Sequence, residues 1–238
     1  MTLPSKALVL GATGVLGSHI TRHLASYPSL EHLIITGRST SRLAPLVKAC
    51  ARDGLTLYPE VLFLGNDDHA DLVHLRERIE QVGINCMIIT MGLHAQTPLG
   101  ADHEAVDALL RVNLSLPLAV MLGIAPLMSR GHILTLSDAM IHRPMKGYAA
   151  YYAAKAGLEA AVTALAPELA PRITINAVAP GIMNVKPGAP KDAEERWSRK
   201  VPMGYLGGVA PIVQTIDFLF GNTYITGSVL PVDGGAYR

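Results

Sequence analysis

Seven short apolar runs alternate with longer, helix-like stretches along the chain, and this alternation constrains the fold more than any other feature. Runs of this length and composition are typical of strands buried on both faces of a parallel sheet. They cover residues 7–10, 33–36, 61–64, 86–90, 132–136, 173–178 and 228–232. The stretches expected to be helices cover residues 15–26, 42–52, 70–82, 103–128, 148–169 and 209–220. The sequence therefore predicts an α/β protein of the doubly wound (Rossmann) type, with a seven-stranded parallel sheet flanked by helices on both faces.

Composition narrows the classes of function. Of the 238 residues half are hydrophobic and 16% are charged, and the net charge is +1. A chain of this length suits one domain over residues 1–238. Its balanced charge argues against nucleic acid or an anionic membrane surface as a partner. The apolar runs are expected to stop well short of a membrane span, and the first residues lack a secretory signal.

Cysteine and histidine usage also limits the classes of function. Cys50 and Cys86 are too few for a disulfide framework, which predicts reduced thiols in a cytoplasmic protein. The nine histidines show no clustering with metal-ligand spacing, so no metal site is predicted.

A glycine-rich turn joins the first predicted strand to the first predicted helix. It reads Gly-Ala-Thr-Gly-Val-Leu-Gly over residues 11–17. Glycine lets the backbone turn tightly and approach a pyrophosphate, whose charge the N-terminus of the following helix stabilises. The alternative is a turn that serves packing alone. Contacts to a dinucleotide are expected from Gly11, Thr13, Gly14, Val15, Leu16 and Gly17.

The end of the second predicted strand indicates which dinucleotide binds. An acidic residue there would accept the ribose hydroxyls of NAD, but the sequence has Arg38 followed by Ser39. A guanidinium favours the 2′-phosphate of NADP, so NADP(H) is the predicted cofactor. Arg42 is a second candidate for this contact, or it is exposed helix surface. After the third predicted strand, Asn66 or Asp67 is expected to contact adenine, although loop capping explains both equally well.

Tyr151 and Lys155 lie four residues apart in an alanine-rich stretch that reads as a helix. Their side chains should therefore share one face. A nearby ammonium favours the phenolate and lowers the pKa of a phenol from its usual value of about 10. The pair predicts an acid or base for hydride chemistry, with Tyr148 and Tyr152 as rival phenols.

These motifs resemble the short-chain dehydrogenase/reductase family over nearly the whole chain. The matching pieces are the glycine turn, Asn113 in Arg-Val-Asn-Leu-Ser, the Tyr151–Lys155 pair, and the segments 176–181 and 224–235. The resemblance implies that Tyr151 donates a proton and that Lys155 binds the nicotinamide ribose. It also implies that Asn113 supports Lys155 through a water. The nicotinamide side would be formed by Met91, Gly92, Pro180, Gly181 and Ile182.

Position 138 is the most informative departure from the family pattern. The family usually has Ser thirteen residues before the Tyr, whereas this chain has Asp138, with Ser137 one place earlier. Because neighbouring strand residues point to opposite sides, Ser137 is a poor substitute. Asp138 and the segments 135–140 and 143–148 resemble the pteridine reductases. A carboxyl group in a half-buried apolar pocket could give a proton to the nitrogen of a C=N bond, directly or through Tyr151. Alternatively, Asp138 only caps a turn and orients Tyr151.

Residues 183–203 are expected to form a flap with a short helix over the substrate, or else a solvated surface excursion. Weak candidates for substrate contact are His94, Met183 and Trp197. The pteridine-reductase aromatic that would stack the substrate is missing, since Leu93-His-Ala-Gln stands in its region.

The sequence thus favours an NADPH-dependent reductase of a small C=N or C=O compound, pterin-like or cyclic, with a ketone or 3-oxoacyl substrate as the alternative. A second hypothesis is an NADP-binding sensor or ligand-shaping protein without hydride transfer. The family resemblance also implies a homotetramer, or a homodimer.

Overall fold

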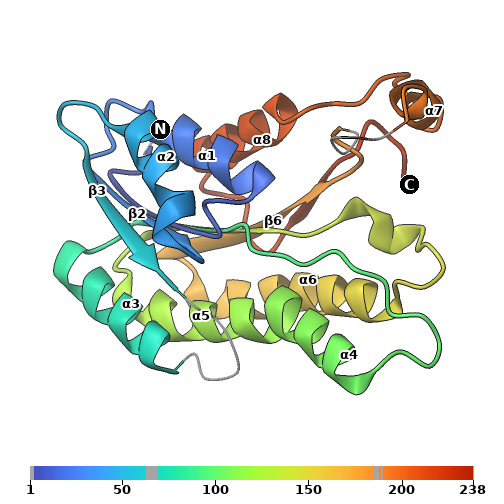
Figure 1. Ribbon diagram of the computed structural model, residues 1–238. Helices are drawn as coiled ribbons and strands as arrows, with labels where there is room; N and C mark the ends of the chain where they lie inside the picture. The colour runs from blue at the N-terminus through green and yellow to red at the C-terminus, as the bar shows by residue number, and fades with distance from the viewer. Residues whose placement is uncertain (1–2, 63–68, 185–187, 189, 238) are drawn as a thin grey trace.

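The computed structural model describes residues 3–62, 69–184, 188 and 190–237. Seven parallel strands form one sheet in the order β3-β2-β1-β4-β5-β6-β7 (Figure 1). The strands are β1 (Lys6–Leu10), β2 (His32–Gly37), β3 (Thr56–Val61), β4 (Cys86–Ile89), β5 (Gly131–Leu136), β6 (Ile173–Pro180) and β7 (Val229–Val232). The predicted doubly wound architecture is confirmed.

The central strands are apolar throughout because both of their faces are covered. In β1, Leu8 faces one hydrophobic core together with Ile34 of β2, whereas Val9 faces a second core. The alternation follows from the two-residue period of a strand. A continuous apolar run is therefore what this position in the sheet requires.

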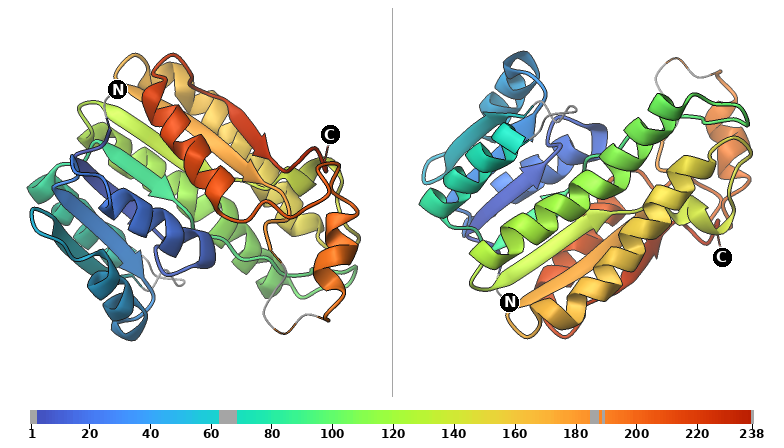
Figure 2. Two further views of the ribbon diagram at one scale, coloured as in Figure 1. Left: turned by 90° about the horizontal axis from the view of Figure 1, so that it is seen from above. Right: turned by 90° about the horizontal axis from the view of Figure 1, so that it is seen from below.

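Helices cover the sheet on both faces, as the two further views show (Figure 2). On one face lie α1 (Val15–Ala25), α2 (Thr40–Cys50) and α8 (Ala210–Gly221). On the other lie α3 (His69–Val82), α5 (Leu116–Ile124) and α6 (Ala149–Leu169), with α4 (His103–Leu110) packed beside α6. A short helix, α7 (Ala193–Ser198), lies in the segment expected to form a flap.

The third strand differs from the sequence prediction of residues 61–64. β3 begins at Thr56 and ends at Val61, and in the part of the chain that the structure describes it pairs with β2 alone, at the edge of the sheet. An edge strand is partly solvated, so it needs no continuous apolar run, and it tolerates Pro59. The apolar run at residues 61–64 therefore did not mark this strand, which ends at Val61.

The single helix expected over residues 103–128 is interrupted. α4 passes into a π-helical turn, Arg111–Ser115, before α5 begins, and a 3-10 turn, Ala125–Leu127, follows α5. By length and composition alone, the stretch His103–Leu127 would suffice to span a membrane, so the expectation that apolar runs stop well short of that length is wrong here. Leu116, Val120 and Ile124 of this stretch pack in the core against the sheet.

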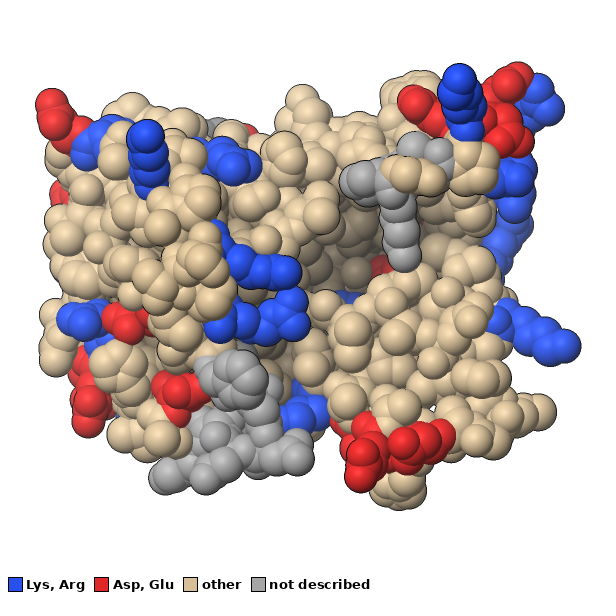
Figure 3. All heavy atoms as spheres, in the orientation of Figure 1, with Lys and Arg blue, Asp and Glu red and all other residues tan. Residues whose placement is uncertain are grey.

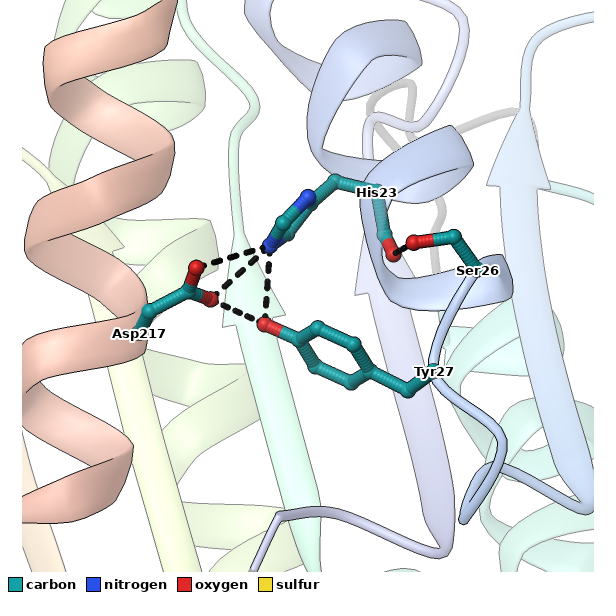
Figure 4. A network of polar contacts seen from close by, with 4 residues as sticks. All are labelled: His23, Ser26, Tyr27 and Asp217. Atoms are coloured by element: carbon teal, nitrogen blue, oxygen red, sulfur yellow. Dashed lines mark hydrogen bonds and ion pairs between the residues drawn. The ribbon is translucent and has the colours of Figure 1, made fainter.

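A polar network ties α1 to α8 (Figure 4). Asp217 of α8 lies 2.8 Å from Nε2 of His23 and accepts a hydrogen bond from the hydroxyl of Tyr27. Tyr27 follows α1 and is buried, and burial together with the Asp217 charge raises its pKa. The phenol therefore remains a hydrogen-bond donor and holds the two helices together.

The order of the strands places a crevice at the carboxyl ends of β1 and β4. The chain leaves β1 toward β2 on one side and returns to β4 on the other, so the connections diverge at this point. In open parallel sheets, ligands bind where such a reversal occurs.

Candidate functional site

The glycine turn follows β1 and borders this crevice. Gly11 has a φ of +78°, which a side chain would strain, and a Cβ on Gly17 would lie 2.2 Å from the Gly11 carbonyl oxygen. The turn therefore packs tightly and brings backbone, not side chains, to the N-terminus of α1. A cavity of about 320 Å³ opens beside it. It is lined by Gly11, Thr13, Gly14, Thr36, Gly37, Arg38, Arg42, Leu62, Thr90, Met91, Gly92, Leu93, Val112 and Leu116.

The remaining residues predicted from the turn do not line this cavity. Val15 is exposed, Leu16 packs against the core beneath α1, and Gly17 serves the close approach of helix and strand. Sequence reasoning treated the turn as one contact surface. In the structure, Gly11, Thr13 and Gly14 line the cavity, whereas Leu16 and Gly17 pack against the rest of the protein.

Two arginines stand at the far wall of the same cavity. Arg38 and Arg42 both line it and are both exposed, while no Asp or Glu lies among the described lining residues. Figure 3 shows Lys and Arg side chains beside a hollow that crosses this face. Ser39 is not in the lining, and its hydroxyl is bonded to that of Ser41. Asn66 and Asp67 lie outside the described residues. The charge of this wall fits a phosphate group better than a ribose diol.

Tyr151 and Asp138 meet although they lie on different elements. The Tyr151 hydroxyl donates a hydrogen bond of 2.6 Å to Oδ2 of Asp138. Asp138 follows β5, and its Oδ1 accepts the backbone N–H of Met140 at 2.8 Å, which caps a short 3-10 turn. The carboxylate thus caps a turn and contacts the phenol, which are the two features of the structural alternative, while its role in proton transfer stays a prediction.

Lys155 is buried one helical turn beyond Tyr151. Its Nζ donates to the carbonyl oxygen of Leu136 at 2.8 Å, not to the phenol. Burial lowers the pKa of Lys155 to about 8, although the charges of Asp138 and Glu159 raise it. The amine therefore loses its proton more readily than an exposed lysine does.

The sequence predicted a lowered pKa for Tyr151, and this prediction is wrong. Burial raises this pKa, and the adjacent charge of Asp138 raises it further. The sequence placed the ammonium close by, but it could not show that the carboxylate is the nearer charge. A phenol that holds its proton is suited to giving it to a reduced substrate.

Asn113 lies in the π-helical turn and is fully buried. Its side chain bonds both backbone groups of Leu93, at 3.1 and 2.9 Å, and the carbonyl oxygen of Leu109 at 3.0 Å. A Cβ on Gly92 would lie 3.2 Å from Oδ1 of Asn113 and 3.6 Å from Nζ of Lys155. The predicted proximity of Asn113 and Lys155 is therefore present, and Asn113 also holds the loop after β4.

The rival phenols have other partners. The hydroxyl of Tyr152 accepts the backbone N–H of Met145, and the ring of Tyr148 stacks on His94 at a centroid distance of 4.6 Å. His94 also meets the edge of the Tyr151 ring at 4.8 Å. Within the described residues, neither rival phenol forms a hydrogen bond with Asp138. Tyr151 is thus the phenol placed for proton transfer, and His94 lies beside it.

Ser137 does not replace the usual family serine. Its hydroxyl donates to Oε1 of Glu159 at 2.5 Å, away from Tyr151. Glu159 was not predicted as a site residue. Its position four residues after Lys155, which places it on the same helix face, could have indicated it.

A second cavity, of about 380 Å³, lies on the substrate side. It is lined by Met140, Arg143, Met145, Ile182, Trp197, Lys200, Val201, Ala236 and Tyr237. Met140 also packs against the cluster that contains Tyr151, so this cavity lies next to that cluster. Of the weak substrate candidates, Trp197 lines it, with Lys200 Nζ 4.3 Å from its ring centroid. Met183 instead lines a smaller neighbouring cavity of about 150 Å³.

The turn after β6 packs tightly against the end of β7, where the Gly181 N–H donates to the carbonyl oxygen of Val232 at 2.9 Å. Pro180 ends the strand, and a Cβ on Gly181 would lie 2.7 Å from Asp233, so only glycine fits there. Ile182 lines both the substrate-side cavity and the smaller one. None of Pro180, Gly181 and Ile182 lines the cavity beside the glycine turn, so their contact with a nicotinamide stays a prediction.

Comparison with known proteins agrees with this geometry. Residues 67–237 match the family described as enoyl-(acyl carrier protein) reductase. The chain is 31% identical to a 3-oxoacyl-(acyl-carrier-protein) reductase of Pseudomonas aeruginosa, over 100% of this chain and 99% of the relative. It is 24% identical to a dihydromonapterin reductase of Klebsiella pneumoniae, over 98% and 96%.

A solved structure, a short-chain dehydrogenase/reductase from Serratia marcescens, superposes with a TM-score of 0.86 at 25% identity and 98% coverage of both chains. The relatives include the pterin-type reductase that the Asp138 pattern indicated. The chain belongs to the short-chain dehydrogenase/reductase family.

Proposed function

We propose that the protein is an NADPH-dependent oxidoreductase that reduces a C=N or C=O bond in a small, cyclic or pterin-like substrate. The observation that carries this proposal is the 2.6 Å hydrogen bond between the Tyr151 hydroxyl and Asp138, one helical turn from the buried Lys155. This trio offers a proton donor, a carboxyl group and a cation within one site.

The cavity beside the glycine turn has the features that NADP(H) requires. Gly11, Thr13 and Gly14 would hold the pyrophosphate at the N-terminus of α1, and Arg38 with Arg42 would hold the 2′-phosphate. Lys155 would bind the nicotinamide ribose, with Met91, Gly92, Gly181 and Ile182 around the ring. When bound, this cofactor supplies the hydride.

The residues of the chain supply the proton. The substrate carbon gains a hydride and its nitrogen or oxygen gains a proton, so the C=N or C=O bond becomes C–NH or C–OH. Tyr151 donates this proton from its hydroxyl group. Asp138, once it has taken up a proton from solvent, either donates in place of Tyr151 or returns that proton to the phenolate. Lys155 stabilises the negative charge left on Tyr151 while its amine is protonated.

The substrate-side cavity supports a small ligand with a flat or apolar body. Its lining is dominated by Met140, Met145, Ile182, Trp197 and Tyr237. Residues 183–203 act as a flap in this proposal, because Trp197 and Val201 from this segment close the cavity.

Purified protein should oxidise NADPH in the presence of dihydropterins, cyclic imines or ketones, followed by absorbance. Tyr151→Phe should lower kcat by about 100-fold or more, since it removes the proton donor. Tyr152→Phe is the matched control, because its hydroxyl is bonded to Met145 and should be dispensable for chemistry. Wild-type protein that leaves NADPH unchanged across the panel would refute the proposal.

A 3-oxoacyl or ketone reductase is the second candidate, favoured by the relative that is 31% identical over the full chain. Asp138→Ser, which introduces the serine that the family usually has, distinguishes the two candidate functions. It should abolish C=N reduction yet preserve ketone reduction. A protein that binds NADPH tightly but turns over no substrate would be a sensor instead.

The assembly proposed is a homotetramer or homodimer in the cytoplasm, without nucleic acid or membrane partners, with residues 1–238 as one domain. Leu122 of α5 and Phe218 of α8 are about half exposed and would suit subunit contacts. Size-exclusion chromatography with light scattering tests this assembly.

A further inference from the structure

Three consecutive residues at the end of β5 are each bonded to a different residue of α6. The Leu136 carbonyl accepts from Lys155, the Ser137 hydroxyl donates to Glu159, and Asp138 accepts from Tyr151. The three α6 residues are spaced four apart, so they form one row on the face toward β5. Two members of this row belong to the proposed catalytic set. The third, Glu159, has no role in it.

Glu159 is placed where a carboxylate is costly. It is half-buried, and burial raises its pKa, while the Ser137 hydrogen bond and the charges of His142 and Lys155 lower it. Asp138 lies close enough that its charge raises the pKa of Glu159 as well. Burying a charged group requires compensating hydrogen bonds. The 2.5 Å bond from the buried Ser137 supplies one.

The bond also restrains the backbone next to Asp138. Ser137 is the residue immediately before Asp138, and its N–H donates to the carbonyl oxygen of Val178 in β6. With the side chain held by Glu159 and the backbone held by β6, Ser137 has little freedom to move. The direction in which the Asp138 carboxylate leaves the strand is then fixed relative to Tyr151.

We propose that Glu159 is a positioning residue of this active site: through Ser137 it fixes the backbone that carries Asp138, and it places a second carboxyl group one helical turn from Lys155. This inference rests on the proposed reductase function. It assigns Glu159 an effect on chemistry without contact with substrate or cofactor.

The test compares Ser137→Ala, Glu159→Ala and Glu159→Gln in the full-length protein. Ser137→Ala and Glu159→Ala should each lower kcat by about tenfold, since small misplacements of a catalytic group are expensive, with little change in KM for NADPH. The double variant should be no slower than either single variant, because both break one bond. Glu159→Gln keeps an acceptor for Ser137 and should restore kcat toward wild type.

Glu168→Ala is the matched control, because Glu168 lies on the same helix but is exposed to solvent. Its kcat and melting temperature should equal those of wild type. If Glu159→Ala fails to fold, Ser137→Ala carries the test, since it removes one hydroxyl group. Equal kcat in wild type and both Ala variants, or strictly additive losses, would overturn the proposal.

A readout without turnover separates this inference from the proposed function. NMR of lysine-labelled protein follows the titration of Lys155 directly. Glu159→Ala should shift this titration to lower pH, because a neighbouring negative charge is removed, whereas Glu168→Ala should not. An unshifted titration overturns the role of Glu159, even where the substrate panel shows no activity.

Discussion

Oδ2 of Asp138 and the hydroxyl of Tyr151 lie 2.6 Å apart, and this contact defines the ionisation of the site. The carboxylate raises the pKa of Tyr151 beyond what burial does alone. In the usual family pattern an uncharged serine occupies the position of Asp138. The chain therefore has a more tightly protonated phenol than that pattern would give.

Asp138→Asn should lower the pKa of Tyr151 relative to wild type, because an amide accepts the hydrogen bond without the negative charge. Reduction of a C=N substrate should fall by about 100-fold if the carboxyl group takes part in proton transfer. The phenolate absorbance as a function of pH measures the first effect, and steady-state kinetics measure the second. Asp53→Asn, an exposed change between α2 and β3, should alter neither.

The pH dependence should follow Lys155. Its pKa of about 8 means that kcat/KM should fall as pH rises through that value, because the ammonium beside the phenol is lost. The pKa of Lys155 is about 8 in the folded protein and 10.5 in the unfolded chain, so between these pH values the unfolded chain binds more protons at this residue. The free energy of unfolding should therefore rise with pH through that window. Lys155→Met should be slow and show no alkaline decline attributable to this group. A wild-type profile that stays level to pH 10 would contradict the assignment.

Arg38→Ala should weaken NADPH binding by about tenfold or more, since a charge-assisted contact to the 2′-phosphate is lost. Affinity for NADH should stay within about twofold, because NADH lacks that phosphate. Fluorescence titration measures both. Arg76→Ala is the control, because Arg76 is exposed on α3 and paired with Glu80. An equal loss for the two nucleotides would show that Arg38 does not read the phosphate.

Gly17→Ala should disrupt the nucleotide turn. Its Cβ would stand 2.2 Å from the Gly11 carbonyl oxygen, so α1 must move away from β1 at a cost of about 1–3 kcal/mol. Thermal unfolding and NADPH titration should both report the change. Gly123→Ala in α5 meets no described atom within 4 Å and should be neutral or slightly stabilising. Equal melting temperatures for the two variants would show that the turn relaxes without penalty.

The sequence predicted the architecture well where burial on both faces dictates composition. The runs that became β1, β2, β4, β5 and β6 were recognisable because each is largely covered. β7 was also recognised, although it lies at the opposite edge of the sheet and is only partly buried. β3 was misplaced because its edge position relaxes that demand, and Pro59 concealed it.

The sequence predicted which residues would meet at the site better than it predicted their pKa shifts. Tyr151, Lys155 and Asp138 were identified from residue type and spacing, but the nearest charge to the phenol is set by how β5 ends against α6. That relationship joins positions 13 residues apart and depends on tertiary packing. Glu159 was not predicted, because its contact with Ser137 joins β5 to α6 and depends on tertiary packing.

The π-helical turn at Arg111–Ser115 has a consequence for the evolution of this chain. A wider turn accommodates one extra residue, so the helix changes phase by about 100° between Asn113 and the stripe of Leu116 and Val120 that packs on the sheet. Deleting a single codon here would straighten the helix while rotating Asn113 away from the loop at Leu93. Length polymorphism at this point should therefore be selected against more strongly than most amino-acid replacements nearby.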